Sequence, residues 1–132
     1  MEHKIRLGII GLGKMGISHL AIAGGNQQVE VVGVCDTSKL VTAFVEKQTP
    51  YKIFDDFRMM VEEAKPDAVI VAVPTKYHAE IIDALLDRHV HVFSEKPLTL
   101  DAKLSQQLAD KAERLGLVNQ VGYHNQIGRA HV

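Results

Sequence analysis

The chain has 132 residues, 46% of them hydrophobic and 23% charged, which is typical of one globular domain rather than two. Its 15 basic and 16 acidic side chains give a formal net charge of -1, which excludes a basic surface for nucleic acid or for an acidic membrane. The single cysteine, Cys35, cannot form an internal disulfide, and no Cys or His pair has metal-ligand spacing. With no signal-peptide pattern and no apolar run of about 20 residues, we expect a soluble, cytoplasmic protein without a metal site.

Apolar runs rich in β-branched residues alternate with segments of helical period, which predicts β-α-β units around a parallel sheet. The expected strands, in chain order, are residues 5–10, 29–35, 51–54, 68–73, 90–94 and 117–122. The expected helices between them are residues 14–23, 39–47, a segment after Asp55, a segment after Pro74 and residues 100–115. The short links predict an α/β, doubly wound Rossmann sheet in the order 3-2-1-4-5-6, with helices on both faces.

Two details of the helices are also predicted. In the second helix, Leu40, Ala43 and Phe44 share one face, which we expect to turn toward the core. Asp55 is expected to cap the start of the third helix.

The residues Gly11, Gly13 and Gly16 form a GxGxxG motif directly after the first strand and at the start of the first helix. The first glycine permits a tight turn, the second lets the backbone approach a pyrophosphate, and the third lets the helix pack near the strand. Glycine-rich turns also begin helices that bind nothing, but this context predicts a dinucleotide site. The motif also contains Leu12, Lys14 and Met15.

Asp36 ends the second strand, 20 residues beyond Gly16. A carboxylate at this position accepts hydrogen bonds from a ribose diol and repels a 2′-phosphate, so the sequence favours NAD over NADP. Helix capping is the alternative role for Asp36. Thr37 follows it, and Lys39 is close enough in sequence to reach a 2′-phosphate, so NADP remains an alternative cofactor.

Two other enzyme classes share part of this pattern. Short-chain dehydrogenases carry glycines in TGxxxGxG spacing and a YxxxK pair, and this sequence has neither. Methyltransferases also place an acid after the second strand, but their glycine loop usually lacks the third glycine. A dinucleotide-binding site of the GxGxxG type therefore explains more of the sequence than either of these classes.

The segment Glu95, Lys96 and Pro97 follows the fifth strand, at the edge where open α/β sheets bind ligands. A lysine there can donate a hydrogen bond to a reacting oxygen or assist its proton transfer. The alternative is a solvated lysine paired with Glu95. Pro97 restricts Lys96 to extended geometry, and the bond between them can be cis.

Taken together, these motifs resemble the Gfo/Idh/MocA oxidoreductases, the family of glucose-fructose oxidoreductase and inositol 2-dehydrogenase. The segments that carry the resemblance are GIIGLGKMG, GVCD, VAVPTKYH, EKPL and GYHN, which begin at residues 8, 33, 71, 95 and 122. The resemblance implies an enzyme that transfers a hydride between NAD(P) and a hydroxyl of a sugar, cyclitol or related polyol. It makes Lys96 the catalytic lysine. It places along the cofactor Val73, Pro74, Thr75, His78, Glu95 and Pro97, and we add Tyr123 and Asn125 as substrate candidates.

The sequence departs from the family after GYHN, where members usually continue into an α/β substrate domain. We therefore expect residues 1–122 to be the cofactor domain and residues 123–132 to be the start of the substrate domain, with little activity in this chain alone. The full-length protein is expected to form a homo-oligomer through the missing domain. A non-catalytic module that binds or senses NAD and binds a partner is the alternative.

The histidines receive separate predictions. His3, His89 and His91 flank strands and are expected at the surface or the sheet edge, and His131 does not match the family's catalytic histidine by position. His19 is expected to pack within the fold. His78 is expected either to contact the nicotinamide nucleotide or to cap the fourth helix.

Overall fold

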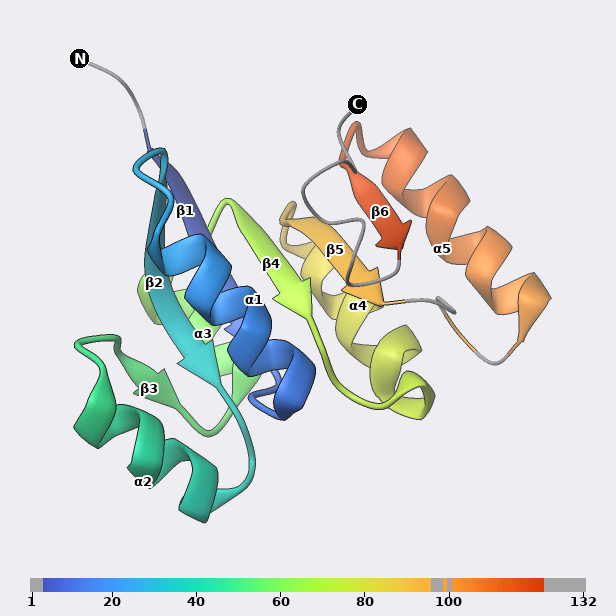
Figure 1. Cartoon of the computed structure of the whole chain (residues 1–132). Helices are drawn as coiled ribbons and strands as arrows, with labels where there is room; N and C mark the ends of the chain where they lie inside the picture. The colour runs from blue at the N-terminus through green and yellow to red at the C-terminus, as the bar shows by residue number, and fades with distance from the viewer. Residues whose placement is uncertain (1–3, 96–98, 100, 123–132) are drawn as a thin grey trace.

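The computed structural model describes residues 4–95, 99 and 101–122. In these residues six parallel strands form one sheet in the order β3-β2-β1-β4-β5-β6 (Figure 1). The strands are β1 (Ile5–Ile10), β2 (Val29–Cys35), β3 (Ile53–Phe54), β4 (Ala68–Val71), β5 (His91–Glu95) and β6 (Asn119–Gly122). The predicted order is therefore confirmed, although β3, β4 and β6 are shorter than expected.

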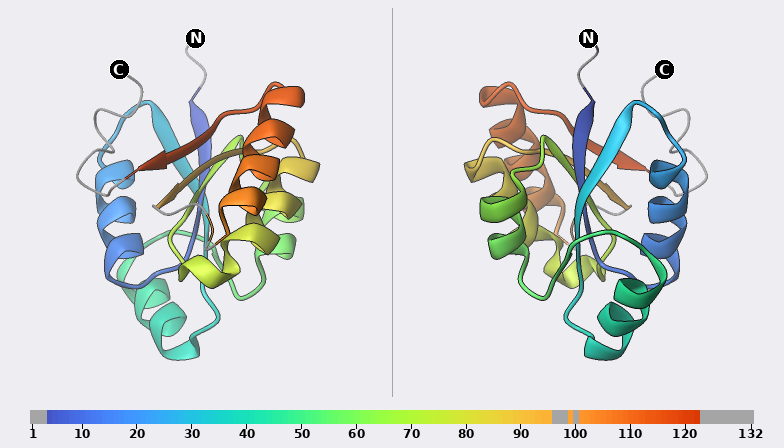
Figure 2. Two further views of the ribbon diagram at one scale, coloured as in Figure 1. Left: turned by 90° about the vertical axis from the view of Figure 1, so that its right-hand side faces the viewer. Right: turned by 90° about the vertical axis from the view of Figure 1, so that its left-hand side faces the viewer.

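Helices cover both faces of the sheet. They are α1 (Lys14–Gly24), α2 (Lys39–Gln48), α3 (Phe57–Ala64), α4 (His78–Asp87) and α5 (Ala102–Arg114), and a short 3-10 turn (Thr75–Tyr77) precedes α4. Figure 2 shows α1 and α2 on one face and α3, α4 and α5 on the other. The chain thus winds outward in one direction from β1 and in the other from β4, which creates a switch point between these two strands. None of the described helices is long and apolar enough to cross a membrane.

Side chains just before three helices satisfy the free amides of their first turns. Ser38 Oγ accepts from the Val41 N–H, Asp56 from the Arg58 N–H, and Asp101 from the N–H groups of Lys103 and Leu104. The prediction that Asp55 caps α3 was therefore wrong by one residue. Two aspartates stand side by side in the sequence, and the backbone geometry at the start of α3 selects the second.

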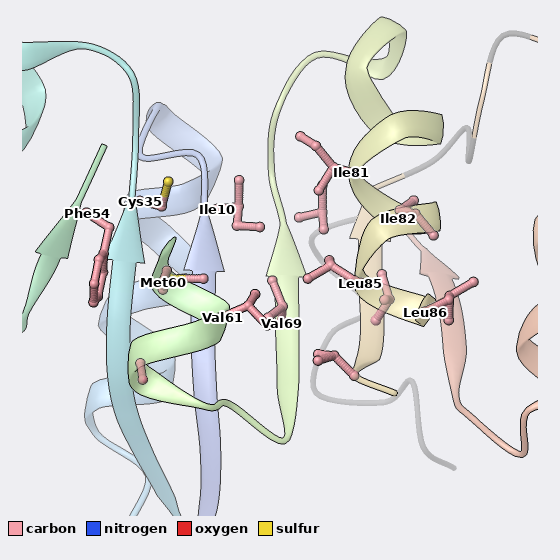
Figure 3. Close-up of a cluster of buried hydrophobic side chains, with 14 of the residues drawn as sticks. Ile10, Cys35, Phe54, Met60, Val61, Val69, Ile81, Ile82, Leu85 and Leu86 are labelled. Carbon is pink, nitrogen blue, oxygen red and sulfur yellow. The ribbon is translucent and has the colours of Figure 1, made fainter. Parts of the chain in front are cut away.

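The larger core lies between the sheet and the helices α3, α4 and α5. Figure 3 shows Met60 from α3 and Leu85 from α4 packed toward the sheet near Val69, and all three side chains are fully buried. Burial of a side chain of this size contributes about 1.5–3 kcal/mol to folding. On the opposite face, Ile9 and Val34 of the sheet pack against α1 and α2 in a second, smaller core.

The inward face of α2 differs from the prediction. Leu40 and Phe44 are 84% and 63% exposed, and Ala43 is exposed too, whereas Val45 is 2% exposed and packs in the smaller core. Val41 packs against the same core. The helix carries two apolar stripes at helical spacing, and the entry of the chain from β2, fixed by the Ser38 cap, turns the valine stripe toward the sheet.

Candidate functional site

A cleft of about 680 Å³ lies at the carboxyl edge of the sheet, around the switch point between β1 and β4. The ends of four strands and the starts of α3 and α4 form its walls. The residues that line it are Ile10, Gly11, Gly13, Cys35, Asp36, Thr37, Asp55, Asp56, Phe57, Ala72, Val73, Pro74, Tyr77, Glu80 and Ile81. Six of the predicted cofactor residues are in this lining: Gly11, Gly13, Asp36, Thr37, Val73 and Pro74.

The three glycines of the loop differ in what surrounds them. Gly11 has a φ of +98°, and a Cβ there would approach the Ala72 carbonyl oxygen to 2.5 Å. A Cβ on Gly16 would lie 1.8 Å from the carbonyl oxygen of Gly11. At Gly13 a Cβ would meet no described atom within 4 Å. The tight turn at Gly11 and the close approach of α1 to β1 at Gly16 are as predicted, and Gly13 faces open space.

The start of α1 is built differently from those of α2, α3 and α5. Gly13 is its N-cap residue and, in the part of the chain that the structure describes, no side chain accepts from its first amides. The first amides of a helix have no partner within the helix and carry the positive end of its dipole. The loop therefore presents backbone donors to an anion at the edge of the cleft.

Asp36 connects this loop to the second strand. Its Oδ2 accepts from the Leu12 N–H at 2.7 Å, and its Oδ1 accepts from the Ser38 N–H at 2.8 Å. The carboxylate thus holds the glycine loop and the turn after β2 together, while Ser38 caps α2. Each carboxylate oxygen has a second lone pair, so the same group can still accept hydrogen bonds from ribose hydroxyls. The side chain of Leu12, by contrast, is buried in the smaller core, so this residue offers the site only its backbone.

Acidic side chains gather where β2 and β3 end. Asp36, Asp55 and Asp56 line the cleft above Cys35. Burial raises the pKa of the Cys35 thiol to about 12, and the charges of Asp56, Asp36 and Asp55 act in the same direction. The thiol stays protonated at neutral pH, and the potential at this end of the cleft is negative.

Apolar side chains also line the cleft and form its apolar wall. It consists of Phe57 at the start of α3, Val73 and Pro74 after β4, and Tyr77 and Ile81 near the start of α4. Flat apolar surfaces of this kind suit the face of a heteroaromatic base. The sequence interpretation did not name Phe57, Tyr77 or Ile81 as site residues. Phe57 follows β3, and Tyr77 and Ile81 follow β4, which borders the switch point.

Lys39, the predicted alternative partner of a 2′-phosphate, lies outside the lining of the cleft. Its side chain is 89% exposed, and its Nζ is 3.9 Å from Oδ2 of Asp55. An acidic neighbour therefore already partners this cation.

Comparison with known proteins agrees with this geometry. Residues 5–123 match the Gfo/Idh/MocA family, described as an oxidoreductase family with an NAD-binding Rossmann fold. The chain belongs to the Gfo/Idh/MocA oxidoreductase family. The resemblance inferred from the motifs is thus confirmed.

Similar proteins are longer than this Gfo/Idh/MocA chain. The rhizopine catabolism protein MocA of Rhizobium meliloti is 30% identical over 91% of the chain and 38% of its own length. The scyllo-inositol 2-dehydrogenase (NAD(+)) of Bacillus subtilis is 29% identical over 99% of the chain and 39% of its own length. The crystal structure of scyllo-inositol dehydrogenase from Lactobacillus casei with bound NAD(H) and scyllo-inositol gives a TM-score of 0.82 at 30% identity, over 89% of this chain and 36% of that one. This chain therefore spans less than two fifths of these relatives.

The remaining predicted site residues fall into two groups. Lys96, Pro97, Tyr123 and Asn125 lie outside the described residues, as do the side chains of Lys14, Met15 and Glu95. Thr75 and His78 are described but do not line the cleft.

His78 lies at the first position of α4 and is 1% exposed. Its Nε2 is 2.9 Å from the Val73 carbonyl oxygen, and because a carbonyl only accepts, the ring donates this hydrogen bond. Among the described residues, no side-chain hydrogen bond caps the start of α4, and the bond from the His78 ring holds the segment after β4 that lines the cleft. Its predicted contact with the nicotinamide nucleotide stays a prediction. His19 is buried and packs edge-on against Phe93, as expected for a packed histidine.

Proposed function

We propose that this chain binds NAD in the cleft and acts as the cofactor domain of an enzyme that transfers a hydride between NAD(P) and a hydroxyl of a sugar, cyclitol or related polyol. The observation that carries the proposal is the bond from the Leu12 N–H to Asp36, which joins the glycine loop to a ribose-binding carboxylate. Family membership supports the use of NAD. The polyol substrate is supported by relatives named scyllo-inositol 2-dehydrogenase and D-glucoside 3-dehydrogenase.

The described residues fit the adenosine and phosphate parts of NAD. Gly13 leaves room for a pyrophosphate beside the first amides of α1, since a Cβ there would meet no described atom within 4 Å and no described side chain caps these amides. Asp36 would accept from the ribose hydroxyls, and the apolar wall of Phe57, Val73 and Ile81 would hold the base.

The bound cofactor would supply the hydride chemistry, and the chain would supply binding and orientation. We assign Lys96 the role of a hydrogen-bond donor to the reacting substrate oxygen, which would help this oxygen lose or regain its proton. Tyr123 and Asn125, which follow β6 in the sequence, are the further proposed substrate contacts.

The proposed division of the protein is a cofactor domain at residues 1–122 and the start of a substrate domain at residues 123–132. The lengths of the relatives support this division, because this chain matches only 38% and 39% of two of them. We propose that most substrate contacts, and the interface of a homo-oligomer, lie in the further domain.

Two measurements test the proposal. Calorimetric titration should show tighter binding of NAD than of NADP, and Asp36→Ala should narrow this difference by about tenfold, which is the scale of a lost hydrogen bond to a charged group. Failure of the chain to bind either cofactor would overturn the proposal.

The chain should bind the cofactor without oxidising a substrate. NADH formation by this chain across a panel of sugars and cyclitols should be close to background, because no described wall holds a substrate carbon against the nicotinamide. A longer parent protein should oxidise at least one polyol, and Lys96→Ala should abolish most of that activity. An undiminished Lys96→Ala parent would remove this lysine from the mechanism.

A further inference from the structure

Asp36 and Asp55 directly follow the neighbouring ends of β2 and β3. Cys35 and Phe54 are paired in the register of β2 and β3, and the next residue of each strand is an aspartate. The Asp36 N–H donates to the Phe54 carbonyl oxygen at 3.2 Å, which keeps the two strand ends together. Both aspartates line the cleft.

The two aspartates have different partners. Both oxygens of Asp36 accept backbone N–H groups, so this carboxylate is held in place. The side chain of Asp55 does not cap α3, because Asp56 performs that role. Its described partner is Lys39, whose Nζ lies 3.9 Å away.

Lys39 is the cation that could attract a cofactor with a 2′-phosphate. Among the described residues that line the cleft, Asp36, Asp55, Asp56 and Glu80 are acidic and none is basic. A phosphate monoester carries close to two negative charges at neutral pH, so it needs a nearby cation to enter such a cleft. As long as Lys39 is paired with Asp55, part of its charge is cancelled.

We propose that Asp55 is a second residue that determines cofactor specificity, and that it acts by engaging Lys39 and withholding it from the 2′-phosphate of NADP. Asp36 rejects the 2′-phosphate directly, and Asp55 rejects it through the lysine. The inference rests on the proposed function, since it presumes that the ribose of NAD(P) lies beside Asp36.

The test compares Asp55→Asn with a matched control, Glu63→Gln. Glu63 forms an exposed ion pair with Lys52 at 3.5 Å and does not line the cleft, so both variants remove one negative charge and one exposed ion pair. Binding of NAD and NADP is measured by calorimetry at low salt, and thermal melting confirms that each variant is folded.

Asp55→Asn should tighten NADP binding relative to NAD binding by about tenfold, the scale of a hydrogen bond to a charged group. The gain should shrink in high salt, because both side chains are exposed. It should also disappear in the double variant Asp55→Asn/Lys39→Met, which lacks the released cation. Glu63→Gln should change neither affinity.

Equal effects of Asp55→Asn and Glu63→Gln on NADP would overturn the inference while leaving NAD binding intact. A gain that persists without Lys39 would overturn it as well, because the proposed route runs through the lysine. A parent chain that binds neither cofactor would overturn the proposed function, and this inference with it.

Discussion

The starts of α1 and α5 lie at the same edge of the sheet, since each helix follows a parallel strand, but their backbone amides are satisfied differently. At α5, Asp101 Oδ1 accepts from the N–H groups of Lys103 and Leu104 at 2.8 and 3.3 Å. At α1, the N-cap residue is Gly13, which has no side chain to offer. The first amides of α5 therefore have a hydrogen-bond acceptor within the chain, whereas the first amides of α1 remain as donors for a ligand.

This difference shows how one fold separates stability from binding. Capping by a side chain stabilises a helix by about 1 kcal/mol, and α1 forgoes that contribution at the position where a pyrophosphate is expected. The close approach of α1 to β1 at Gly16 keeps the uncapped end in place.

Gly16→Ala should cause the largest loss of stability. The added Cβ would lie 1.8 Å from the Gly11 carbonyl oxygen, and a backbone atom cannot swing away as a flexible side chain can. We expect the free energy of unfolding in urea to fall by about 3 kcal/mol or more, as for severe overpacking.

The control for Gly16→Ala is Gly25→Ala, at the other end of α1. Gly25 has a φ of −89°, and its added Cβ would come no closer than 3.8 Å to its neighbours. This change should alter the free energy of unfolding by no more than about 1 kcal/mol. Equal effects of the two variants would contradict the role assigned to Gly16.

Gly13→Asp should cap the first turn of α1 and weaken the binding of NAD. An added Cβ would meet no described atom within 4 Å, so the fold should be kept or slightly stabilised by the new cap. A carboxylate beside the expected pyrophosphate should weaken NAD binding by about a hundredfold through like-charge repulsion. NAD should therefore raise the melting temperature of the parent chain and not that of the variant.

Gly13→Ser separates the two effects of that substitution. It supplies a cap without a charge, so it should retain more NAD affinity than Gly13→Asp. Full NAD affinity in Gly13→Asp would show that the start of α1 does not hold the phosphates.

The sequence was sufficient to predict the features that depend on local residue patterns. The strand order and the positions of the glycine loop and Asp36 were predicted, because each depends on β-branched runs, turn residues and short links. The inward face of α2 was not predicted, because the helix carries two apolar stripes and the sequence pattern fits both equally well. Only the packing of α2 on the sheet determines that Val45 is buried and Phe44 is exposed.

The composition of the cleft was predicted only in part. Phe57 comes from the start of α3, whereas Tyr77 and Ile81 come from the segment around the start of α4, and only the arrangement of the strand ends brings the two segments together. The pairing of Lys39 with Asp55 depends on the same arrangement. The geometry of a site at a switch point is therefore a property of the sheet order, and it becomes visible only when neighbouring strand ends are considered together.

Asp101→Ala should cause a moderate loss of stability without a loss of affinity for NAD. Removing the cap leaves two amides of α5 unsatisfied, so the free energy of unfolding should fall by about 1 kcal/mol. NAD affinity should stay within about twofold of the parent chain. A loss of affinity as large as that of Gly13→Asp would contradict the contrast between the two helix starts.

The smallest effect is expected on the outer face of α2, a helix that begins beside the cleft but is capped by Ser38. Phe44 is 63% exposed, so Phe44→Ala removes little buried surface and should change the free energy of unfolding by no more than about 0.5 kcal/mol. Val45→Ala, one position along, removes two buried methyl groups and should cost about 2 kcal/mol. Urea unfolding of both variants measures the difference. A larger cost for Phe44→Ala than for Val45→Ala would mean that α2 presents its other stripe to the sheet, and the Ser38 cap and the neighbouring Lys39–Asp55 pair would then need to be placed anew.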